Sequence, residues 1–99
     1  MNQHDVIQQA WALTEQIEAA TAGCDWPRAA ELAEARAPLL MSLQADQPAD
    51  ALATIRKIQS STASVMQAAQ TAQTALVANH RRSMDQANAA GLYQQAARL

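Results

Sequence analysis

The chain has 99 residues, a net charge of -2 and only two glycines and three prolines. Phenylalanine is absent and aromatic residues make up 3% of the chain, which argues against a β-sandwich or barrel and favours an all-helical fold. The seven basic residues are scattered apart from two adjacent pairs, so we expect no basic face for nucleic acid. We also expect no membrane insertion and no signal peptide, because no sufficiently long apolar run is present.

Cys24 is the single cysteine, which excludes an internal disulfide and makes a reducing cytoplasm the expected location. A reactive thiol is the less favoured interpretation, because Arg28 is the one basic residue near it. Two histidines, His4 and His80, are available for acid–base or metal chemistry. His80 lies one helical turn from Met84, but that face offers no second histidine or cysteine, so we expect no metal. We therefore predict no catalytic residues and no cofactor.

Residues 5–22 are predicted to form the first helix, with Asp5 as its N-terminal cap. Apolar residues recur there at alternating steps of three and four, which is typical of a packed helical seam. The seam consists of Val6, Ala10, Leu13, Ile17, Ala20 and Cys24. Trp11 lies on its flank, where packing is favoured over recognition. Gly23 is expected to end this helix in the left-handed conformation.

Residues 26–44 are predicted to form the second helix. Asp25 is its expected cap, and Pro27 falls in the first turn, where the missing N–H costs nothing. The connection to the first helix is short, so the two helices should form an antiparallel hairpin. Pro38 should kink the second helix, with helical residues on both sides of it.

Arg36 falls on or beside the apolar seam of the second helix. We expect its aliphatic stem to pack while its guanidinium reaches water or an acid such as Glu31, Glu34 or one on a neighbouring helix. A buried ion pair is the second choice, and a catalytic role is the least favoured interpretation.

No proline or glycine occurs between Ala49 and Ala90, which predicts a third helix over residues 49–89. That helix would span about 40 residues and roughly 60 Å, against roughly 30 Å for each of the other two. We thus predict an all-α fold in one domain over residues 1–99. It should be an antiparallel three-helix bundle with two short helices, one long third helix and a short C-terminal helical tail.

The end of the third helix has two interpretations. Ser83 and Gln86 match a capping box, so a break near residue 82 is the alternative to continuation to about residue 89. Residues 91–99 should then form the short tail. Within it, Leu92 and Tyr93 are candidates to fold back and cover the binding surface of the third helix.

A narrow apolar stripe follows the third helix at helical period. Two short helices can cover only its first half, so we expect the later half to be exposed. We predict that an amphipathic segment of a partner binds there, by helix-in-groove recognition. Self-association as a homodimer through the same stripe is the alternative. The predicted partner-binding residues are Val65, Ala69, Ala72, Leu76, Val77, His80 and Met84.

A family pattern begins at the junction of the first two helices. Its members are Asp25, Trp26, Leu32, Arg36, Leu39, Leu40 and Leu43. In this order and spacing, after an amphipathic first helix and before a long third helix and a late Tyr93, they resemble the FliT family of flagellar export chaperones. The resemblance covers most of the chain, and it gives Asp25, Trp26, Leu32, Arg36, Leu39 and Leu40 a structural role.

The resemblance implies a cytoplasmic chaperone for the filament-cap protein FliD. Such a chaperone binds the C-terminal segment of the cap protein, prevents its premature assembly and delivers it to the flagellar type III export apparatus through the export ATPase complex. Family members also bind the flagellar master transcription regulator, and a C-terminal helix can cover their binding surface. The corresponding segment here is short, which weakens the expectation of regulator binding. The alternatives are a helical dimeric scaffold and a regulatory adaptor without export substrates.

Overall fold

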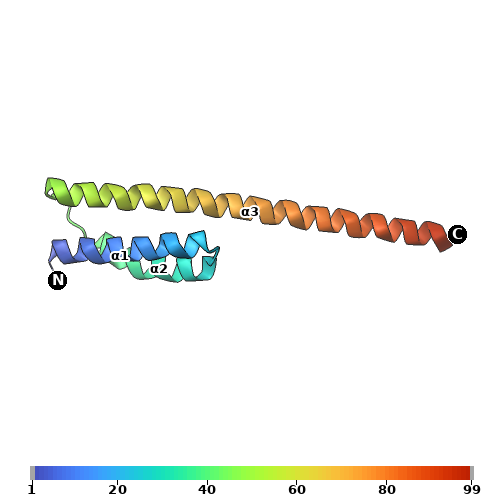
Figure 1. The fold of residues 1–99 in the computed structure, drawn as a ribbon, viewed down its shortest axis with the longest axis horizontal. Coiled ribbons are helices and arrows are strands. Elements are labelled where there is room, and N and C mark those ends of the chain that lie inside the picture. Colours follow the sequence, from blue (N-terminus) through green and yellow to red (C-terminus); the bar gives the residue numbers. More distant parts are fainter. Residues whose placement is uncertain (1, 99) are drawn as a thin grey trace. The chain divides into compact units, whose positions relative to one another are not determined.

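The computed structural model describes the backbone of residues 2–98, and the side chains of residues 2–89 and 91. In this part of the chain the fold is all-helical, with three helices and no strand (Figure 1). They are α1 (Gln3–Ala22), α2 (Trp26–Met41) and α3 (Ala49–Arg98). The chain divides into two compact units, Met1–Ala69 and Gln70–Leu99, which we call the N-terminal and C-terminal units. The all-helical prediction is therefore confirmed, and each unit is described separately.

The start of α1 lies two residues before the predicted one. Asn2 is the cap, because its Oδ1 accepts a hydrogen bond of 2.8 Å from the Asp5 backbone N–H. Asp5 lies instead in the first turn, where its carboxylate faces the positive end of the helix dipole. Asparagine and aspartate cap helices about equally well, so the sequence alone did not decide between them.

The prediction that Gly23 takes the left-handed conformation in the turn between α1 and α2 is wrong. Gly23 has φ -86°, whereas Cys24 has φ 57° and takes the left-handed conformation. The Cys24 N–H donates to the Thr21 carbonyl (3.0 Å) and the Asp25 N–H to the Ala20 carbonyl (2.8 Å). These two bonds form a Schellman motif, which requires the left-handed residue one position after Gly23.

Helix α2 begins as predicted and ends earlier than predicted. The Asp25 carboxylate accepts from the Arg28 N–H at 3.3 Å, and Pro38 lies inside the helix with helical residues after it. The helix ends at Met41 rather than near residue 44, because Ser42 closes it. The Ser42 hydroxyl donates to the Leu39 carbonyl at 2.8 Å, and this bond replaces one that a continuing helix would make.

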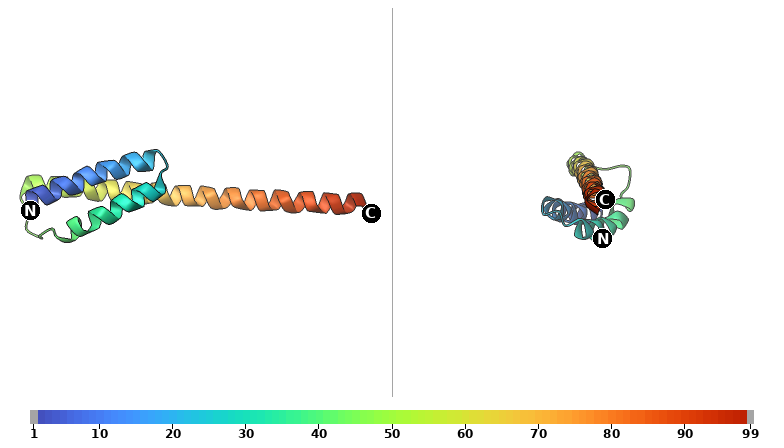
Figure 2. Two further views of the ribbon diagram at one scale, coloured as in Figure 1. Left: turned by 90° about the horizontal axis from the view of Figure 1, so that it is seen from below. Right: turned by 90° about the vertical axis from the view of Figure 1, so that its right-hand side faces the viewer.

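The core of the N-terminal unit is built by all three helices. Ile17, Ala29 and Leu32 form its centre, and Val65 of α3 packs against them. The buried apolar side chains among the described residues are Val6, Ile7, Ala10, Ile17, Ala29, Leu32 and Ile58. Figure 2 shows α1 and α2 beside the first part of α3. Ile58 and Val65 of the predicted stripe thus pack within this unit.

Gln3 fixes the connection between α2 and α3 to the start of α1. Its Nε2 donates to the Ser42 carbonyl (3.3 Å), and its Oε1 accepts from the Gln44 N–H (3.0 Å) and from Gln47 Nε2 (2.9 Å). One side chain therefore holds, by three hydrogen bonds, a loop that lies at least 39 residues away in sequence.

Helix α3 runs from Ala49 to Arg98, past both predicted ends. Ser83 is helical and so does not act as a cap, since a cap residue needs non-helical dihedral angles. Gly91 has no positive φ and lies within the helix, which tolerates a glycine at a cost of about 1 kcal/mol. The backbone of residues 91–98 continues α3 in place of a separate tail. The predicted folding-back of Leu92 and Tyr93 concerns side chains outside the described residues.

Candidate partner-binding site

The C-terminal unit carries large apolar side chains in contact with solvent. Leu76 is 71% exposed, Val77 48% and Met84 51%. Successive residues of a helix are about 100° apart, so these three and His80, which is also exposed, lie within about 100° of one another on α3. We call Leu76, Val77, His80 and Met84 the α3 apolar face. Their exposure agrees with the expectation from the sequence, and their role in binding stays a prediction.

The other predicted partner-binding residues are less exposed. Ala72 lies in the C-terminal unit next to the α3 apolar face and is half-buried. Val65 and Ala69 are also half-buried, but they belong to the N-terminal unit, where Val65 packs on the core. The seven predicted residues are therefore divided between the two units, and only four of them are exposed.

A groove in the N-terminal unit has an apolar lining and a volume of about 270 Å³. It forms because α2 presents alanines, whose short side chains leave space beside α3. We call it the alanine groove. Its lining residues are Ile17 of α1, Trp26, Ala29, Ala30, Ala33 and Arg36 of α2, and Thr62, Val65, Met66 and Ala69 of α3.

Arg36 lies in the wall of the alanine groove and is only 7% exposed. Its Nη1 donates to Thr14 Oγ1 at 3.0 Å, and the Thr14 hydroxyl donates to the Ala10 carbonyl at 2.7 Å. Arg36 Nε is buried and has no hydrogen-bond partner in the structure. Burial away from water lowers the pKa of Arg36 from its ordinary value, yet an arginine stays charged at neutral pH.

The acid predicted to pair with Arg36 is not there. Glu34 is two residues from Arg36 and Glu31 five, so both lie on other sides of α2, where they are exposed. Glu31 forms an ion pair with Arg28 instead, at 3.5 Å and open to water. The guanidinium of Arg36 is thus held by a hydroxyl, and both the solvated head and the ion pair expected from the sequence are wrong.

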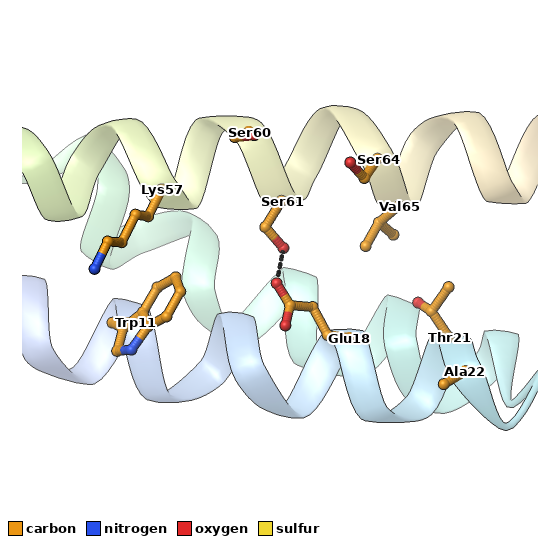
Figure 3. A pocket seen from close by; sticks show the side chains of 9 residues that line it. All are labelled: Trp11, Glu18, Thr21, Ala22, Lys57, Ser60, Ser61, Ser64 and Val65. Carbon is orange, nitrogen blue, oxygen red and sulfur yellow. Dashed lines mark hydrogen bonds between the residues drawn. The ribbon is translucent and has the colours of Figure 1, made fainter.

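A second hollow of the N-terminal unit, of about 520 Å³, lies between α1 and α3 and is lined largely by polar side chains (Figure 3). The Ser61 hydroxyl donates to the Glu18 carboxylate across it. Trp11 and Lys57 point toward one another at one end of the view. The hydrogen bond between Ser61 and Glu18 thus joins α1 and α3 across this hollow.

The family-like residues have structural positions in the N-terminal unit. Asp25 caps α2, Leu32 lies in the core and Trp26 lines the alanine groove. Leu39 and Leu40 are half-buried near the end of α2. Thr14 is absent from the predicted set although it holds Arg36. Its position on the flank of the first seam was visible in the sequence, but its pairing with a residue of another helix was not.

Among the described residues, no group of three or more histidine, cysteine, aspartate or glutamate side chains lies close enough to hold a metal ion. Over the same residues, no helix combines the length and apolar character needed to cross a membrane. No protein-family model, curated protein or solved structure matches the chain.

Proposed function

We propose that the protein is a cytoplasmic chaperone of the flagellar type III export system that binds the C-terminal segment of the filament-cap protein FliD. The observation that supports this proposal most directly is the α3 apolar face, with Leu76, Val77 and Met84 about half exposed or more. Isolated exposed apolar residues are common, but several on one side of a helix are typical of a binding surface. The resemblance to the FliT family supplies the identity of the partner.

The proposal includes the arrangement of the helices. We propose that α1, α2 and the first part of α3 form an antiparallel three-helix bundle, which serves as the folded body of the chaperone. The contact of Val65 with Ile17, Ala29 and Leu32 is compatible with this arrangement. The later part of α3 has no buried side chain among the described residues, which suits a segment that waits for a ligand.

The energetics are compatible with a chaperone that must release its cargo. Burial of about 500 Å² of apolar area would contribute on the order of 10 kcal/mol before the costs of association and ordering. After those costs, a micromolar dissociation constant is expected. Met84 supplies an adaptable apolar contact, because its side chain is unbranched and flexible.

The cap protein would be held unassembled by this contact and delivered to the export ATPase complex. The binding of a flagellar master transcription regulator belongs to the same proposal.

The experiment is isothermal titration of the protein with the C-terminal peptide of the cap protein. Leu76→Asp and Val77→Asp should each weaken binding at least tenfold, because each would bury a carboxylate against an apolar ligand. Ala75→Asp is the matched control, since Ala75 is exposed on another side of α3 and should bind normally. Equal binding by all three variants would contradict the proposal.

The same exposed face favours a helical dimeric scaffold as the second candidate function. Light scattering at low protein concentration separates the two, because a scaffold would be a stable dimer that ignores the peptide. A regulatory adaptor would instead recover the transcription regulator in a pull-down from flagellated cells, without the cap protein.

A further inference from the structure

The alanine groove combines two properties that do not occur together in an ordinary packing defect. Its lining is apolar almost throughout, and yet its wall contains the buried side chain of Arg36. Burial of a charged group is costly unless the group is paired or fully hydrogen-bonded. Arg36 has one hydrogen bond from Nη1, to Thr14, and its buried Nε has none.

The geometry of the guanidinium indicates which ligand would complete it. Nη1 donates to Thr14 and Nε is closed to solvent, so Nη2 is the nitrogen left for a ligand. An arginine N–H donates to a carboxylate oxygen in a charge-assisted hydrogen bond, which is stronger than one between neutral groups. A phosphate would bring more charge than a single arginine in an apolar groove can neutralise, so a carboxylate is the better match.

The walls of the groove indicate the shape of the ligand. Ala29, Ala30 and Ala33 give α2 a flat surface, and helices approach each other most closely where the side chains between them are small. The lining residues extend over about three turns of α2, roughly 15 Å, and about two turns of α3, roughly 10 Å. Met66, 59% exposed at the rim, offers an adaptable apolar contact.

We propose that the alanine groove binds a helical peptide segment of a partner whose small or aliphatic side chains enter the groove and whose single aspartate or glutamate pairs with Nη2 of Arg36. This site lies wholly in the N-terminal unit. It is separate from the α3 apolar face and does not depend on the export function.

The test is selection of a displayed library of 12-residue helical peptides on the full-length protein. The wild-type protein should enrich peptides with one acidic residue between aliphatic ones. The same selection on Arg36→Met should lose the acidic preference, since methionine keeps an unbranched apolar stem without the charge. Titration of the most enriched peptide should show at least tenfold tighter binding than its Glu→Gln form to wild type, and equal binding of both forms to Arg36→Met.

Three further variants make the outcome of the selection unambiguous. Ala30→Leu fills the groove at an exposed lining position without touching Arg36, and it should abolish binding even if Arg36→Met fails to fold. Leu76→Asp should leave binding of the selected peptide unchanged, which separates this site from the α3 apolar face. As a control for charge alone, Arg28→Met removes an exposed arginine of the same helix and should keep the acidic preference.

The proposal is overturned by any of three results. These are no enrichment on the wild-type protein, the same acidic preference on Arg36→Met, and a wild-type dimer that Ala30→Leu dissociates. The last result would make a second copy of the chain the occupant of the groove.

Discussion

Cys24 carries the one positive φ found among the described non-glycine residues. A side chain in the left-handed conformation costs about 1 kcal/mol or more, because its Cβ approaches the following carbonyl oxygen. The two hydrogen bonds of the Schellman motif, to the carbonyls of Thr21 and Ala20, require this conformation. The turn between α1 and α2 therefore carries this cost in free energy.

Cys24→Gly should therefore stabilise the protein. Removing the Cβ relieves the strain, and we expect a gain of about 1 kcal/mol in the free energy of unfolding, a rise of roughly 4–8 °C in melting temperature. Urea denaturation followed by circular dichroism measures it. Cys24→Ala is the control, because it removes the thiol and keeps the Cβ. Equal stability of the glycine and alanine variants would contradict the assignment of strain to Cys24.

Thr14 is the residue on which the buried charge of Arg36 depends. Thr14→Val keeps the shape of the side chain and removes the oxygen that accepts from Nη1. We expect a loss of about 2 kcal/mol in stability, because a hydrogen bond to a charged group is lost and the buried guanidinium is left without a partner. Chemical denaturation of the purified variant measures the change.

A double-mutant cycle with Arg36→Met shows whether the loss of stability in Thr14→Val comes from the contact with Arg36. In the Arg36→Met background, Thr14→Val should cost less than about 1 kcal/mol, since no buried charge then needs the hydroxyl. If Thr14→Val costs the same in both backgrounds, the contact with Arg36 does not hold the guanidinium in the fold.

At the scale of the helices, the sequence predicted the elements well and their ends less well. The apolar period from Val6 to Ile17 and the absence of glycine and proline between Ala49 and Ala90 are properties of whole segments, and they predicted that both segments are helical. The ends of the helices depend on single hydrogen bonds. Asn2 rather than Asp5 caps α1, and Ser42 closes α2 before the predicted residue, because each competes with an equally suitable neighbour.

The sequence predicted the candidate site only in those properties that depend on a single helix. The exposure of Leu76, Val77 and Met84 could be predicted because the third helix is longer than the first two. The environment of Arg36 depends on Thr14 of another helix, and no local pattern in the sequence indicates that contact. The alanine groove likewise needs α2 and α3 together.

A prediction for a single helix concerns Gly91 in α3. It lies within α3 and has no positive φ, and a Cβ at this position would meet no neighbouring atom within 4 Å. Gly91→Ala should raise the helical content measured by circular dichroism and stabilise the end of α3 by roughly 0.5–1 kcal/mol. A fall in helical content would indicate that the chain needs the glycine for a break at that position.

At the scale of the whole molecule, the buried core belongs to one of the two units. Every buried apolar side chain among the described residues lies in the N-terminal unit. The fragment of residues 1–69 should therefore unfold cooperatively on its own, with a free energy within about 2 kcal/mol of the full chain, because the later residues contribute no buried core. Non-cooperative melting of this fragment would mean that residues 70–99 contribute to the core.

The α3 apolar face is tested most directly by hydrogen–deuterium exchange with and without the C-terminal peptide of the cap protein. In the free protein, the amides of residues 72–84 should exchange faster than those of α1 and α2, because little is packed against them. Bound peptide should protect residues 72–84 and leave the same segment of Leu76→Asp unprotected. Protection that is absent, or that is confined to residues 3–41, would contradict the central claim that this face of α3 binds the partner.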